Sequence, residues 1–391
     1  KVIRRNIRLA EGDAFVPSLI ARSKTLIGNL GFFSGLDVQE RPSTRSGYSD
    51  ILVKVAEAST GEVSFGGGYS SQVGGILNLG ISEKNFLGKG QRVSINAKLS
   101  ERENDYTLNL AEPYLFNRDI YSSLNLYDNA VDYKESSYDL KREGINLSGN
   151  YTLSEFIRQS IRYSLEVRDL NPKTGASAAI IAEKGKTTLS EISTSINVDT
   201  TNNSLTPSEG YNFSLASAYA GLGGDKDFVR VINTGNYYQS YNDELIIFGL
   251  GYDAGVIMGL GQDILISDRY FLGGNNFRGF EQSGIGPRDT VSKDSLGGNL
   301  YYTGSLKATF GVGLPPELGI KGNWFTTLGS LTGIDNSSLN FKDNSSIRMS
   351  TGLGISWNSP FGPISVILSQ ALLKEDYDIT ESVSFGIGTK F

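Results

Sequence analysis

The pattern of apolar and polar residues changes at about position 60 and then persists to the end of the chain. From there on, apolar residues alternate with small polar residues in about sixteen segments, each of roughly 8–12 residues. In YTLNLAEPYLF, for example, Tyr106, Leu108 and Leu110 alternate with polar residues. An alternation with a period of two predicts β-strands whose two faces meet different environments.

The composition of the polar face indicates which environments these are. It holds mainly Gly, Ser, Asn and Thr, whereas the other face carries Leu, Ile, Val and aromatic residues. A soluble antiparallel sheet turns a more highly charged face to water. The pattern therefore predicts an all-β transmembrane barrel of about sixteen antiparallel strands with a polar lumen. A large soluble β-protein such as a propeller is the alternative, but no blade-length repeat is visible.

The connections between the segments alternate in length. LGKGQ, SYNDE and SPFGP are short, whereas DNAVDYKESSYD, DLNPKTGASAAIIAEKGK and TGIDNSSLNFKDNSS are long. Short turns at one end and long loops at the other are typical of bacterial outer-membrane barrels. An even number of strands puts both chain ends on the short-turn side, which is the periplasm. We therefore expect a bacterial outer-membrane location with the N-terminal residues in the periplasm.

Residues 1–57 have a different pattern and predict a separate unit. Ile20, Ile27 and Leu30 have helical spacing, and a second helix is expected before them. GLDVQERPS and YSDILVKVAEA are expected to form two strands. The sequence therefore predicts a small α+β domain, followed by the barrel at 58–391.

The composition excludes several classes of chemistry. The chain has no Cys and no His, so a Cys/His zinc site, a Ser-His-Asp triad and a histidine acid or base are impossible. The net charge of −6 argues against nucleic acid as a partner. No apolar run is long enough for a transmembrane helix. The sequence predicts a protein that is not an enzyme and needs no cofactor or metal.

A glycine-rich segment, FLGGNNFRGF, lies in the long connection expected at about 261–298, after the eleventh barrel strand. Its glycines would let the backbone run close to another surface, and its aromatic rings could pack the tip. An ordinary surface loop with a solvated arginine is the other interpretation. The residues of interest are Gly273, Gly274, Phe277, Arg278, Gly279 and Phe280.

These features together resemble the BamA-type family of outer-membrane assembly factors, whose members join polypeptide-transport-associated (POTRA) domains to a barrel. VIRRNIRLAEGDAF, SKTLIGNLGFF and DILVKVAE are similar to a last POTRA domain, which would be incomplete here because its first strand is missing. DRYFLGGNNFRGF matches the family's loop-six signature, and FGIGTKF is similar to its closing strand. The resemblance covers essentially the whole chain.

The resemblance implies that loop six folds into the barrel lumen and that Arg278 docks on the inner wall. The family usually supplies acidic partners for this arginine, but the equivalent positions here are Lys307 and Thr327. Asp253, which the alternation places on the lumen side, or backbone carbonyl groups are the alternative partners.

The first and last strands of a barrel must pair to close it, and both are rich in glycine here. Interior glycines weaken strand pairing. The resemblance implies that this seam opens laterally, so that a strand of another protein can add to the exposed edge. The residues alone equally allow glycines that only relieve crowding in the lumen. The residues of the expected seam are Gly66, Gly67, Gly68, Gly386, Gly388 and Phe391.

The function implied by the resemblance is the assembly and insertion of β-barrel proteins into the bacterial outer membrane. The partners would be unfolded outer-membrane barrel proteins, accessory outer-membrane lipoproteins, periplasmic chaperones and the lipid bilayer. The alternative is a two-partner-type secretion pore that translocates an exported protein through the barrel. For the POTRA-like unit, substrate binding by strand addition and a passive spacer are both open.

Overall fold

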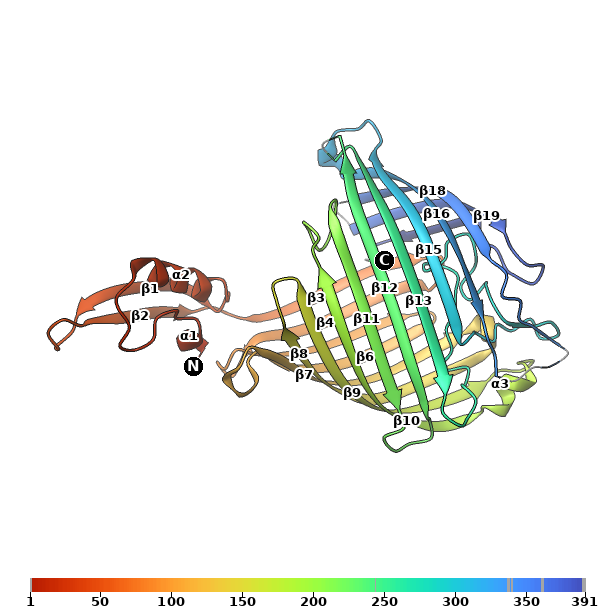
Figure 1. The fold of residues 1–391 in the computed structure, drawn as a ribbon, viewed down its shortest axis with the longest axis horizontal. Coiled ribbons are helices and arrows are strands. Elements are labelled where there is room, and N and C mark those ends of the chain that lie inside the picture. The colour runs from red at the N-terminus through yellow and green to blue at the C-terminus, as the bar shows by residue number, and fades with distance from the viewer. Residues whose placement is uncertain (1, 243, 336–337, 339, 360–361, 389–391) are drawn as a thin grey trace.

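The structure is a computed structural model that describes residues 2–242, 244–335, 338, 340–359 and 362–388. It consists of a small N-terminal unit and a large barrel, and the unit stands out from one end of the barrel (Figure 1). No helix among the described residues is long and apolar enough to cross a bilayer.

Sixteen antiparallel strands of the described chain close into a barrel, and each strand lies where the alternating pattern predicts one. This confirms the predicted fold class. The barrel strands are β3 (Gly61–Ser70), β4 (Gly74–Phe86), β5 (Gln91–Ser100), β6 (Glu103–Glu112), β7 (Ile120–Tyr133), β8 (Tyr138–Thr152), β9 (Ile157–Pro172), β10 (Gly185–Asp199), β11 (Gly210–Ala220), β12 (Phe228–Tyr241), β13 (Ile246–Gly259), β15 (Leu300–Gly311), β16 (Ile320–Thr332), β18 (Arg348–Ser359), β19 (Gly362–Leu373) and β20 (Val383–Ile387).

The alternation along each strand separates an outer apolar face from a polar lumen. Leu147 of β8 pairs with Leu124 and Tyr163 on the outer face and is 53% exposed. The next residue, Asn146, pairs with Asn125 and Ser164 on the opposite face. In a bilayer, every backbone N–H and C=O must find its hydrogen-bond partner within the protein. A closed barrel with an apolar exterior meets this requirement.

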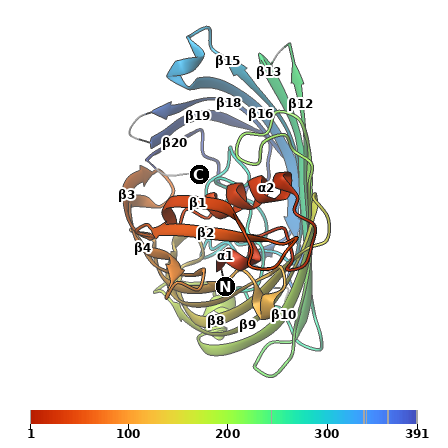
Figure 2. The same ribbon diagram turned by 90° about the vertical axis from the view of Figure 1, so that its left-hand side faces the viewer.

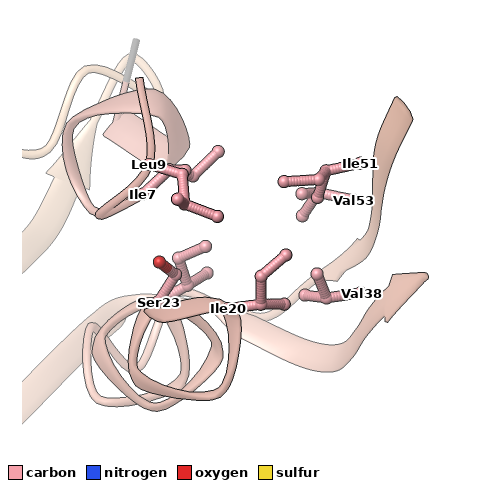
Figure 3. Close-up of a pocket in the computed structure, with 8 residues that line it drawn as sticks. Ile7, Leu9, Ile20, Ser23, Val38, Ile51 and Val53 are labelled. Atoms are coloured by element: carbon pink, nitrogen blue, oxygen red, sulfur yellow. The ribbon is translucent and has the colours of Figure 1, made fainter. Parts of the chain in front are cut away.

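The N-terminal unit contains two helices and a two-stranded sheet, and α2 packs on β1. Its elements are α1 (Val2–Arg5), α2 (Pro17–Gly28), β1 (Phe33–Pro42) and β2 (Ser49–Glu57), and the two strands pair antiparallel. This is the element order that the sequence predicts. Figure 3 shows the apolar interior of the unit, where a small cavity is lined by Ile7, Leu9, Ile20, Ile27, Val38, Ile51 and Val53 around Ser23.

The N-terminal unit lies in front of one opening of the barrel, which we call its near end (Figure 2). Arg5 connects the unit to the turns at this end. The guanidinium lies 4.6 Å from the ring centroid of Tyr114, and its Nη2 donates to the carbonyl of Lys89 at 3.1 Å. Glu112 lies 3.6 Å away. A cation–π contact, one charged hydrogen bond and an ion pair thus fix the unit against the barrel.

The loops at the end of the barrel away from the N-terminal unit contain more regular structure than the sequence predicts. The connection expected at 128–139 is mostly strand, because β7 and β8 remain paired up to Tyr133 and Tyr138. These extended ends and α3 (Ala178–Ala182) pack on residues of the long loop between β13 and β15. The buried residues of this cluster are Tyr138, Leu140, Leu170, Ala176, Ile180, Ile266 and Leu296. Further short elements are β14 (Arg288–Asp289), which pairs with β17 (Phe341–Lys342), and the 3-10 turns η1 (Leu115–Asn117), η2 (Lys134–Ser136) and η3 (Pro316–Leu318).

The two faces of β8 give a direct test of this arrangement. We expect Leu147→Arg to lower the free energy of unfolding in lipid vesicles by about 2–4 kcal/mol, because it places a charge in the lipid. Asn146→Arg, one position along the strand, should cost less than half as much, because the lumen is polar. Urea unfolding of both variants measures this difference, and equal costs would contradict the assignment of the faces.

Candidate functional site: the lumen loop and the barrel seam

The connection between β13 and β15, residues 260–299, is loop six, and it lies inside the ring of strands (Figure 2). Phe277 and Phe280 are fully buried and meet edge to face, with ring centroids 5.4 Å apart. They pack with Leu272 of the loop and with Tyr301 and Leu331 on the barrel wall. Loop six therefore has an apolar core of its own, shared with β15 and β16.

Three glycines let the backbone of loop six run close to its surroundings. Gly273, Gly274 and Gly279 have φ angles of 134°, 61° and 93°, which side chains disfavour. A Cβ atom at Gly279 would lie 2.7 Å from the Cβ of Ser350 on β18. Any larger residue at this position would force the loop away from the wall.

Arg278 rests on the inner wall of the barrel through its ring contact and its backbone. The guanidinium carbon lies 5.4 Å from the ring centroid of Phe325 on β16. The Oγ of Ser350 donates to the carbonyl of Arg278 at 2.5 Å. A cation–π contact and a backbone hydrogen bond thus hold the arginine in this structure.

The suggested pairing of Arg278 with Asp253 is not found among the described residues. Asp253 does face the lumen, but its Oδ1 accepts a hydrogen bond from the hydroxyl of Tyr301 at 2.6 Å. Lys307 and Thr327 lie on the lumen face of β15 and β16, and Lys307 is the register partner of Phe325. Arg278 therefore has an aromatic ring and a cation as neighbours, and no ion pair joins it to an acidic side chain among the described residues.

A buried cluster of charges, which sequence reasoning did not find, anchors the start of loop six. Asp268 is 5% exposed, and its Oδ2 accepts a hydrogen bond from Lys226 at 2.7 Å. Its Oδ1 pairs with Arg168 of β9, which also pairs with Glu166. Burial raises the pKa of the Asp268 carboxyl, but the attraction of Arg168 and Lys226 outweighs burial, and this pKa lies below its ordinary value.

A second buried ion pair supports loop six from the side of the last strands. Arg348 of β18 pairs with Asp378 in the connection between β19 and β20, with Nε and Oδ2 2.9 Å apart and both side chains fully buried. The same connection holds the arginine motif, because the backbone N–H of Glu381 donates to Gly279 at 3.2 Å and that of Glu281 donates to Ile379 at 3.0 Å. The ion pair thus fixes the surface on which this part of loop six rests.

The seam between β20 and β3 is the shortest pairing in the described barrel. β20 pairs with β3 only through Gly386 with Ser70 and Ile387 with Tyr69. β19, the other neighbour of β20, pairs with it at five positions. At the near end of β3, Val63 and Phe65 are 79% and 78% exposed.

The glycines of the seam have different environments. Gly388 has a φ angle of 79°, and a Cβ there would lie 2.5 Å from the carbonyl oxygen of Gly67 and 3.1 Å from the Cα of Gly68. Close approach of the two backbones thus requires glycine at position 388. A Cβ at Gly66 would meet open space. Gly386 lies in the paired part of β20, and Phe391 lies outside the described residues.

Loop six reaches the seam from the lumen side. A cavity of about 30 Å³ is lined by Arg278 and Asn275 of loop six together with Ser70 of β3 and Ser384 of β20. The arginine motif and the closing strands therefore share one small space.

The buried ion pair beside loop six gives a prediction with a matched control. Asp378→Asn leaves Arg348 buried without its carboxylate, so we expect the free energy of unfolding in vesicles to fall by about 3–5 kcal/mol. Asp376→Asn, the same change at an exposed residue two positions away, should stay within about 0.5 kcal/mol of the wild type. Urea unfolding measures both, and similar values would mean that the pair does not support this region.

The chain has sequence relatives among bacterial and mammalian proteins. It is 32% identical over 394 residues to the outer membrane protein assembly factor BamA of Neorickettsia risticii, covering 100% of this chain and 53% of the relative. The chain thus spans about half the length of that BamA relative. It is also 26% identical over 398 residues to the sorting and assembly machinery component 50 homolog of Bos taurus, covering 95% of this chain and 82% of the relative.

Solved structures share the fold. BamA from Haemophilus ducreyi lacking POTRA domains 1–3 matches with a TM-score of 0.89 at 20% identity, over 100% of this chain and 81% of that one. CdiB from Acinetobacter baumannii matches with a TM-score of 0.59 at 15% identity, over 97% of this chain and 69% of that one. The predicted outer-membrane barrel and its resemblance to BamA are confirmed. Because the model of the Omp85 superfamily domain matches residues 85–391, the chain belongs to the Omp85 superfamily.

Proposed function

We propose that this chain is the membrane part of a factor that assembles and inserts β-barrel proteins into the bacterial outer membrane. Its similarity to proteins named outer membrane protein assembly factor extends over its whole length, which supports this activity. The lack of cysteine and histidine is consistent with a role that involves binding and folding. The free energy would come from the folding of the client protein.

The observation that carries the mechanism is the short pairing between β20 and β3. In a bilayer, an unpaired backbone N–H or C=O costs several kcal/mol, because no water is present to replace the missing partner. Of the described residues, β20 contributes two register partners to β3, whereas β4 contributes ten. If this short pairing opens, a strand of a client barrel that pairs with β3 would remove the cost of the open edge, and the client could extend its own sheet from that edge.

Loop six supports this seam from inside. Its apolar core packs on β15 and β16, and its arginine motif contacts β18 and the connection that leads into β20. We infer that loop six keeps these late strands in place while the contact between β20 and β3 opens. The backbones of Gly67 and Gly388 would then separate, and so would the stacked rings of Tyr69 and Phe385, whose centroids lie 5.6 Å apart across the seam.

The N-terminal unit, residues 1–57, would be an incomplete POTRA domain in the periplasm. β1 and β2 pair only with each other among the described residues, so each has an edge that can accept a further strand. Unfolded outer-membrane barrel proteins, accessory outer-membrane lipoproteins and periplasmic chaperones are the partners we infer for this side. A passive spacer is the alternative role for the unit.

A two-partner-type secretion pore is the second candidate function. The likeness of the fold to CdiB favours it only at the level of architecture, because that match has 15% identity. In such a pore the lumen would conduct an exported protein, and the seam would stay closed. The two functions therefore differ in whether the seam must open.

A disulfide across the seam distinguishes these two functions. The chain has no cysteine, so Tyr69→Cys with Ile387→Cys introduces one pair at register partners, where a disulfide can form. We expect the oxidised variant to lose its ability to insert an outer-membrane barrel protein into lipid vesicles, and to regain it on reduction. The measured quantity is the folded fraction of that client protein.

The control introduces a pair of cysteines between two strands that need not separate in either function. Ile81→Cys with Ile95→Cys links β4 to β5 at paired positions on the outer face. This variant should insert the client equally well when oxidised and when reduced. Full insertion by the oxidised seam variant would contradict an opening seam and favour the closed pore.

A further inference from the structure

Two cations lie close together on the lumen wall without a carboxylate. The guanidinium of Arg278 lies over the ring of Phe325, and Lys307 is the residue directly opposite Phe325 on the neighbouring strand. Side chains at such opposite positions have Cβ atoms about 4.5–5.5 Å apart. Among the residues that the structure describes, neither cation forms an ion pair with an acidic side chain.

We propose that Arg278 and Lys307 form a binding site for a carboxylate group in the barrel lumen. Two like charges this close repel each other, and the partly closed lumen screens them less than bulk water does. A carboxylate between them would convert the repulsion into two attractive pairs. Arg278 has planar donors that match both carboxylate oxygens, and Lys307 can supply a third donor.

The surroundings of the two cations fit a polar ligand. Ser305 and Thr327 are register partners on the same lumen face, two residues along from Lys307 and Phe325. Their hydroxyl groups can donate to an oxyanion, and they bear no charge that would exclude one. Lys307 is exposed to the lumen, and Arg278 is only partly buried, so an anion can reach both from the interior.

Binding at this site would stabilise loop six. The backbone of Arg278 and Gly279 is already fixed to Ser350 and Glu381. A carboxylate would tie the side chain of Arg278 to β15 as well, through Lys307. The docking of loop six would then depend on whether a carboxylate is present, whatever function the barrel performs.

Hydrogen exchange of loop six tests the proposal on the full chain in detergent micelles or vesicles. The amides of Gly274 and Glu281, which donate to Phe280 and Ile379, flank the arginine. We expect sodium acetate to slow their exchange about fivefold relative to sodium chloride at equal ionic strength, as about 1 kcal/mol of stabilisation requires. Equal exchange in the two salts would overturn the proposal.

Variants identify the residues involved. Lys307→Glu supplies the carboxylate within the chain. In this variant the amides of Gly274 and Glu281 should exchange about fivefold more slowly in chloride than in the wild type, and acetate should not slow them further. Lys307→Gln should lose the response to acetate. Lys321→Gln is the matched control, because Lys321 lies on the same face of β16, four residues from Phe325, about 13 Å along the strand. If Lys321→Gln lost the response to acetate equally, the response would be due to general screening of charge, and this would overturn the proposed site.

Two peptides distinguish the source of the carboxylate. The blocked peptide Gly-Ser-Glu-Ser-Gly and its Gln counterpart differ only in one carboxylate group. Protection by the Glu peptide at a lower concentration than acetate would support a carboxylate carried by a polypeptide in the lumen. Protection at the same concentration as acetate would support a free carboxylate ion. Protection by the Gln peptide equal to that by the Glu peptide would overturn the proposed chemistry.

Discussion

The closure of the sheet into a barrel is the constraint on which the rest of this structure depends. Inside a bilayer, the backbone groups of every strand need partners, and an open edge is therefore costly. The described chain meets this requirement with extensive strand pairing around most of the ring, but with two residue pairs between β20 and β3. Among the described residues, β20 and β3 thus share the fewest register pairs of any neighbouring strands in the barrel, and the proposed opening of the seam rests on this observation.

Loop six is fixed to the inside of the barrel at several places. It is anchored at its start by the buried charges around Asp268, in its middle by an apolar core on β15 and β16, and at its arginine motif by β18. The buried pair of Arg348 and Asp378 holds the connection that leads into β20 against the same motif. These contacts join loop six to β15, β16 and β18 and to the connection that leads into β20.

The barrel strands could be predicted from the sequence because a strand between lipid and a polar lumen must alternate along its whole length. The contacts of loop six could not be predicted in this way. Arg168, Lys226 and Asp268 are far apart in the sequence, and nothing local indicates that they meet. The extension of β7 and β8 to Tyr133 and Tyr138 could not be predicted either, because their polar, charged ends have the composition of a loop and they pack on loop six only in the fold. The partner of Arg278 could not be predicted because its guanidinium rests on the ring of Phe325, which alternation alone does not mark as a partner.

The most direct measurement is depletion of the full-length protein in its own cells, followed by quantitative proteomics of the outer membrane. An assembly factor serves many clients, so an early and broad loss of unrelated barrel proteins is the result that the proposed function requires. Loss of a single exported protein, with the other barrels intact, would contradict it. The short seam would then be a feature of packing, and the secretion-pore function would replace the assembly function.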